Sequence, residues 1–165
     1  MPTQDEDRKY LQAALPELKA YLLSDILYYP LGGNLPRLTL GGILLAQRRL
    51  GTPPDPQFAT VKETWRAAWT KKAAQETEAR LTLWRNYLND YRRDPEQAEN
   101  YPYEVRWRVM LTLLLPEAET SPADLPALDR FLRANLLSAP FIWDADLAKN
   151  FPQDEFWFLY GRLQK

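Results

Sequence analysis

A carboxylate and a guanidinium in the middle of a largely apolar helical stripe are the first candidates for chemistry. Glu76 and Arg80 are four residues apart, the spacing at which a carboxylate and a guanidinium meet on one side of a helix. Trp69 and Trp84 flank them, and indole rings can form the walls of a polar pocket and attract a cation. One interpretation of the pattern, an alternative to the leading function given below, is a pocket that binds a small ligand or uses a carboxylate for catalysis.

Three further residues are candidates for the same pocket. Asp25 falls between apolar positions of an N-terminal helix, and Arg106 lies on a helix that is apolar almost all round. A charge in such a place needs a partner of opposite sign or a route to solvent. Trp107 would add another indole. Asp25 can equally be a solvated carboxylate near a helix end, paired with an arginine such as Arg37.

The pocket depends on the helix that carries it. Residues 55–93 contain no helix-breaking residue after Pro56, so we expect one continuous rod of nearly forty residues. An amphipathic helix should not place ions in the middle of a buried stripe, yet this one carries Lys72, Glu76 and Arg80 there. Three explanations stay open: the helix projects beyond the body, it breaks near residues 73–77, or the ions line a pocket.

The remaining elements are also expected to be helical. Apolar spacing predicts helices over residues 5–29, with a kink or a junction of two abutting helices at Pro16, and over residues 36–50, closed by Gly51. Gly41 and Gly42 inside the second helix suggest that another helix crosses closely there. Residues 51–56 form a stiff, proline-rich connector, with Asp55 capping the rod. Further helices are expected over residues 103–115, from Ser121 to 134 or 137, and after Pro140 and Pro152, and no strand is expected. The fold prediction is an all-α, irregular bundle of six or seven helices around one long third helix, with residues 1–165 as a single all-helical domain.

Composition narrows the possible chemistry. The chain has no histidine and no cysteine, which removes the usual general base and every thiolate metal site. Residues 144–155 have the length of a calcium loop, but Lys149 occupies the position that demands glycine. No metal ligands, catalytic residues or cofactor are therefore predicted. Arginine and proline enrichment would suit a thermophilic source or high-GC codon usage equally.

Partners are inferred from charge and aromatic content. A formal charge of −1 gives no general attraction for nucleic acid or an anionic membrane, so a nucleoprotein role is a secondary alternative. The polar N-terminus and the absence of a long apolar run lead us to expect a cytoplasmic protein with no membrane contact. Aromatics crowd residues 141–160, and the interface candidates there are Trp143, Phe156, Trp157 and Phe158. The leading functional prediction is a non-catalytic helical interaction or regulatory module that binds a protein partner or its own copy.

Overall fold

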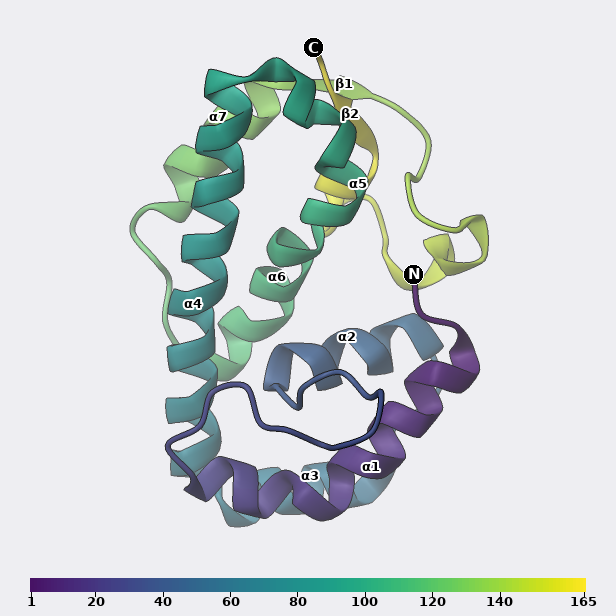
Figure 1. The fold of residues 1–165 in the computed structure, drawn as a ribbon, viewed down its shortest axis with the longest axis vertical. Coiled ribbons are helices and arrows are strands. Elements are labelled where there is room, and N and C mark those ends of the chain that lie inside the picture. The colour runs from purple at the N-terminus through teal and green to yellow at the C-terminus, as the bar shows by residue number, and fades with distance from the viewer. The chain divides into compact units, whose positions relative to one another are not determined.

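The computed structural model describes residues 1–165, which pack into two compact units. The first unit contains residues 1–77 and 113–120, and the second contains residues 78–112 and 121–165. The chain is mostly helical, which confirms the all-α prediction, and a short two-stranded sheet is the only regular β-structure (Figure 1). The prediction of a single domain stays a prediction.

The first unit begins with helix α1 (Gln4–Leu23), which ends earlier than expected. Thr3 caps its N-terminus by accepting the Glu6 N–H at 3.1 Å, and Pro16 lies within it without dividing it. Ser24 stops the helix because its backbone is extended and its hydroxyl donates to the Tyr21 carbonyl at 2.8 Å. The expected helical turns up to residue 29 are therefore absent.

Helix α2 (Leu40–Leu50) packs against α1. It begins four residues later than predicted, where the Thr39 side chain accepts the Gly42 N–H, and it ends as predicted at Gly51, which has φ 68°. A Cβ at Gly42 would lie 2.5 Å from the Tyr10 hydroxyl oxygen of α1, so the glycine permits this approach. The neighbour at Gly42 is thus a side chain of α1, which packs against α2, and the close crossing of two helices at Gly41 and Gly42 stays a prediction.

The prediction of one rod over residues 55–93 is wrong. The structure has two helices, α3 (Pro56–Thr64) and α4 (Arg66–Arg93), separated by Trp65, whose ψ of 41° is not helical. No proline or glycine marks this break, and the Lys19 ammonium of α1 lies 5.1 Å from the Trp65 ring centre. The long helix is thus the fourth, and residues 73–77 lie inside it without a break. The start was predicted correctly, because Asp55 caps α3 and Pro56 is its first residue.

The second unit contains most of the short elements. They are η1 (Pro95–Asn100), α5 (Tyr101–Glu104), α7 (Leu125–Asn135), β1 (Leu136–Ser138), η2 (Ala145–Asn150), η3 (Trp157–Leu159) and β2 (Gly161–Leu163). Helix α6 (Arg106–Ala118) begins in this unit and ends in the first. Strands β1 and β2 are antiparallel, with Leu137 opposite Arg162, so the expectation of no strand is wrong.

Several predicted boundaries in this half were also wrong. The helix expected over residues 103–115 is divided at Val105, and α6 continues through Pro116. Asp124, rather than Ser121, precedes the first residue of α7. The two short helices expected after Pro140 and Pro152 are replaced by 3₁₀ turns and strand β2.

The C-terminal aromatics form an interior cluster rather than an amphipathic helix. The rings of Phe151 and Phe156 are 5.1 Å apart, and those of Phe156 and Phe158 are 6.0 Å apart, both edge to face. Phe156 and Phe158 are completely buried, so they are not available to a partner in this conformation. Trp143 and Trp157 keep part of their surface exposed. The interface prediction for Trp143, Phe156, Trp157 and Phe158 stays a prediction.

Candidate functional site

Lys72 on α4 occupies a buried position at the C-terminal end of α1. Its ammonium donates to the carbonyl oxygens of Ser24 at 2.8 Å and Ile26 at 2.9 Å, and it lies 4.7 Å from the Tyr21 ring centre. The last carbonyls of a helix lack intrahelical partners and carry partial negative charge. Ser24 is the C-cap residue of α1 and Ile26 follows it in the connection, so Lys72 places a cation just beyond this helix end.

Glu76, one turn further along α4, lies at the N-terminal end of α2, where the helix end carries the opposite partial charge. It is fully buried, and both carboxylate oxygens lie 3.0 Å from the backbone nitrogen of Gly41, the second residue of α2. The first N–H groups of a helix are unpaired and partially positive, so a carboxylate is favourable there. Together with Thr39, Glu76 completes the N-terminal cap of α2.

These two ions hold both ends of one segment, residues 24–39, which we name the α1–α2 connection. Lys72 binds its beginning, and Glu76 binds the helix that follows its end. Between them, Tyr29 and Leu38 exchange backbone hydrogen bonds of 3.1 and 2.8 Å. The Tyr10 hydroxyl also accepts the Thr39 N–H and donates to the Arg37 carbonyl. The connection is therefore a fixed loop, although it contains no regular helix or strand.

The electrostatics of Lys72 reflect this burial. Loss of water lowers the pKa of its ammonium from the ordinary 10.5, whereas the Asp25 carboxylate acts in the opposite direction. Asp25 itself is exposed on the α1–α2 connection. The site is thus a buried cation stabilised by carbonyl dipoles, with a solvated carboxylate nearby.

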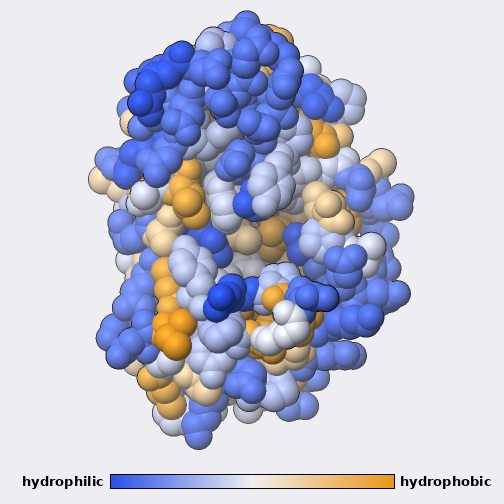
Figure 2. Space-filling view, viewed as in Figure 1, coloured by the Kyte–Doolittle hydropathy of each residue, from blue (hydrophilic) through white to orange (hydrophobic).

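The α1–α2 connection and the end of α1 present large apolar side chains to solvent. Leu23 is 53% exposed, Ile26 46% and Tyr28 41%. Figure 2 shows hydrophobic atoms, interrupted by polar ones, in the lower part of the molecule where this loop runs in Figure 1. The contacts described above hold the backbone that carries these side chains in place. We call Leu23, Ile26 and Tyr28 the apolar loop surface.

The residues proposed from sequence divide between the two units. In the first unit, Trp69 is buried and its indole N–H donates to Glu117 at 3.3 Å, while Asp25 and Glu76 have the positions just described. In the second unit, Trp84 is buried against Tyr87 and Tyr101. The Arg80 guanidinium carbon lies 5.0 Å from the Trp107 ring centre. Arg106 lies 3.8 Å from the same ring.

The ligand pocket predicted at the middle of the long helix stays a prediction. Glu76 serves α2 by capping an N–H group, and Arg80 lies against an indole ring. Sequence reasoning noted that the ions in this stripe were unusual. It missed Lys72 as a site residue and the apolar loop surface, because residues 24–29 had been assigned to a helix.

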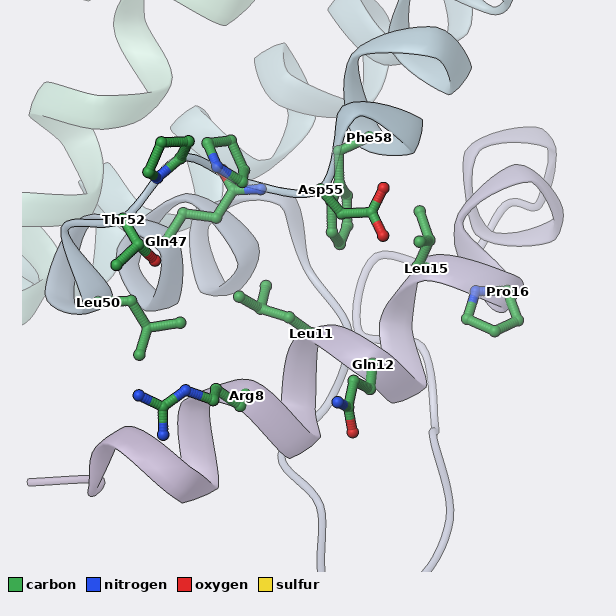
Figure 3. Close-up of a pocket in the computed structure, with 12 residues that line it drawn as sticks. Arg8, Leu11, Gln12, Leu15, Pro16, Gln47, Leu50, Thr52, Asp55 and Phe58 are labelled. Atoms are coloured by element: carbon green, nitrogen blue, oxygen red, sulfur yellow. The ribbon is translucent and has the colours of Figure 1, made fainter.

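A separate groove lies in the first unit between α1, the end of α2, the proline connector and α3 (Figure 3). It is open to solvent, with a volume of about 360 Å³. Leu11 and Leu15 of α1 point toward Leu50 of α2 and Phe58 of α3, and Arg8, Gln12 and Asp55 supply polar groups. The expected stiff connector thus forms one wall of a groove, which the sequence did not indicate.

Comparisons with known proteins give no relative: no family model, curated protein or solved structure matches the chain. None of its helices combines the length and apolar character needed to cross a membrane. The functional argument therefore depends on the site geometry.

Proposed function

We propose that the protein is a non-catalytic interaction module that binds a protein partner, or a second copy of itself, through the apolar loop surface. The observation that supports this is the exposure of Ile26 and Tyr28 on the α1–α2 connection, which two buried ions hold, and of Leu23 at the adjoining end of α1. The three side chains lie within six residues of one another in the sequence, and apolar side chains that are exposed together are typical of interaction sites.

The fixed backbone strengthens this proposal. Ordering a flexible loop on binding costs free energy, so a loop that is already held loses less on association. Lys72 and Glu76 use their charges on backbone groups of α1 and α2. In this proposal their function is to position the surface, and they perform no chemistry.

Selection from a random peptide library on the immobilised full chain tests the proposal. Peptides enriched on the wild type are expected to lose about tenfold or more in affinity for an Ile26→Glu variant, because the charge would be desolvated at the centre of the contact. Leu137→Glu is the matched control, because Leu137 is 55% exposed and lies in the second unit. Sedimentation of the wild type and the same variants over a concentration series tests whether the chain binds its own copy. Self-association through the apolar loop surface should be weaker in Ile26→Glu than in Leu137→Glu. Monomers throughout, together with peptides that bind the Ile26→Glu variant as tightly as the wild type, would contradict the proposal.

A small-ligand function is the second candidate, and the groove in Figure 3 favours it. Ligand pockets are mostly apolar concavities of about 300–1,000 Å³ with a few polar groups, and this groove has that character. A ligand that binds there would raise the melting temperature of the wild type. The same compound should not stabilise a Leu11→Arg variant, and the absence of stabilisation across a metabolite panel would remove this candidate.

A further inference from the structure

Three neighbouring residues in the second unit, none of which belongs to the apolar loop surface, form what we call the arginine stack. They are Tyr103 on α5 and Arg106 and Trp107 on α6. The Arg106 guanidinium carbon lies 3.5 Å from the Tyr103 ring centre and 3.8 Å from the Trp107 ring centre. A cation held against two rings has little conformational freedom left. Its position is therefore set before any ligand arrives.

The hydrogen-bonding capacity of Arg106 is largely unused within the chain. One Nη1 N–H donates to the Tyr103 carbonyl at 3.0 Å, and no carboxylate lies within 4.0 Å of the guanidinium. A guanidinium has five N–H donors in a planar fork, so most have no acceptor in the protein. Partial burial has also removed water from the group and lowers its pKa. An oxyanion from outside the chain would supply the missing acceptors.

The surroundings favour a singly charged, planar oxyanion. Glu104 lies next to the stack, where its carboxylate accepts the Trp107 indole N–H at 3.0 Å. The Glu104 charge would repel a phosphate dianion more strongly than a carboxylate, whereas the Arg80 guanidinium, whose carbon lies 5.0 Å from the Trp107 ring centre, adds positive charge that attracts either anion. Tyr103 is 65% exposed and offers an apolar ring beside the cation. Tyrosine, tryptophan and arginine are the residue types that dominate protein interfaces.

We propose that the arginine stack is a docking point for an aspartate or glutamate side chain of a protein partner. Arg106 would bind the carboxylate through its unused N–H groups, and the Tyr103 ring would cover the adjacent methylene groups of the acidic residue. This inference depends on the proposed function, because it takes a protein segment as the ligand. The inference specifies one contact that the partner would make, through residues that are distant in sequence from the apolar loop surface.

A peptide array tests the inference. Each peptide is made with glutamate at one position and again with glutamine or phosphoserine there, and binding of the full chain is measured. Arg106→Lys keeps the charge but removes the planar fork, so the affinity for glutamate peptides should fall about tenfold while glutamine peptides are unaffected. Arg133→Lys is the matched control, because the Arg133 guanidinium carbon lies 3.6 Å from the Trp157 ring centre.

The possible results separate this inference from the function on which it depends. Peptides that bind equally with glutamate or glutamine, or a loss of affinity that is the same in Arg133→Lys, would overturn the carboxylate site and leave the interaction module standing. Tighter, Arg106-dependent binding of phosphoserine peptides would replace the carboxylate with a phosphate and also overturn it. An array on which no peptide binds would overturn both proposals. Equal melting temperatures of Arg106→Lys and the wild type are the check that the variant is folded.

Discussion

At the scale of single residues, the structure gives a physical reason for ions in a buried stripe. A buried charge is costly unless hydrogen bonds and favourable dipoles replace the lost water. Lys72 donates to the carbonyls of Ser24, the C-cap of α1, and of Ile26 just beyond it, and Glu76 accepts the Gly41 N–H at the start of α2. Each ion lies at the helix end whose partial charge is opposite to its own. Their shared effect is to fix the segment between those ends.

Replacing Lys72 with methionine should destabilise the protein. The substitution keeps much of the side-chain volume but leaves the Ser24 and Ile26 carbonyls without their donor, at a cost of about 1–3 kcal/mol. The shift in free energy of unfolding is measured from urea denaturation. The neighbouring Lys71 is exposed, and Lys71→Met should change stability by no more than about 0.5 kcal/mol. Equal effects of the two substitutions would contradict the capping role.

Buried tyrosines in the second unit should make the protein unstable in alkali. Burial raises the pKa of Tyr87, with smaller contributions from Glu104 and Tyr91, and burial also raises the pKa of Tyr101 well above the ordinary 10.0. The folded state then keeps protons that the unfolded state loses near pH 10. The contribution of these tyrosines to the free energy of unfolding is consequently fully present below pH 10, and it is lost as the pH rises above 10. The contribution of Lys72 to stability changes with pH in the opposite direction. Between its lowered pKa in the folded state and 10.5, the unfolded state binds more protons, so this contribution rises with pH.

Melting temperatures measured across this range check the alkaline prediction. Tyr87→Phe should show a smaller loss of stability above pH 10 than the wild type, because one group whose ionisation drives unfolding is gone. The exposed Tyr103 provides the control, and Tyr103→Phe should leave the slope unchanged. If the melting temperature of Tyr87→Phe falls with pH as steeply as that of the wild type, this residue does not govern alkaline unfolding.

At the scale of elements, the close contact between α1 and α2 depends on Gly42. Alanine is normally favoured over glycine inside a helix by about 1 kcal/mol. Here its methyl group would lie 2.5 Å from the Tyr10 hydroxyl oxygen and 3.0 Å from the Thr39 hydroxyl oxygen, so Gly42→Ala should lower stability instead. Removing the Tyr10 hydroxyl should relieve part of that cost. A double-mutant cycle with Tyr10→Phe measures it, and an additive result would contradict the steric explanation.

Elements with local chemical signals were predictable from sequence. Gly51 marked the end of α2, and Asp55 with Pro56 marked the start of α3. The break at Trp65 had no such signal, because neither proline nor glycine is present there. The C-terminal turns were missed for a related reason: aromatics spaced like a helix face pack against one another in an irregular interior.

The candidate site was predictable only in part. The ions in the stripe could be recognised as unusual because they interrupt an apolar helix face. Their partners could not be found from sequence, because they are backbone groups 48 and 35 residues away. Backbone acceptors and donors occur at every residue, so nothing in the sequence distinguishes the carbonyl of Ser24 or the N–H of Gly41. The arginine stack was partly anticipated, since Arg106 and Trp107 were candidates, whereas Tyr103 was not.

At the scale of the whole molecule, each unit has buried aromatic side chains and buried charged groups. In the first unit, caps and buried ions also order a loop. The second unit's largest fully buried side chains are Trp84, Tyr101, Phe151, Phe156 and Phe158. A loss of the Lys72 contacts should therefore loosen the α1–α2 connection first, while amides in the second unit keep their protection.

Amide hydrogen exchange of Lys72→Met, with Lys71→Met and the wild type beside it, tests the central claim most directly. The claim is that the buried ions of α4 hold the α1–α2 connection in place. The exchange of the Tyr29 and Leu38 amides, which bond to each other's carbonyls, should become faster in Lys72→Met alone, while amides in the middle of α4 stay protected. Unchanged exchange at Tyr29 and Leu38 would show that the connection is held by something else, and the proposed surface would lose its basis.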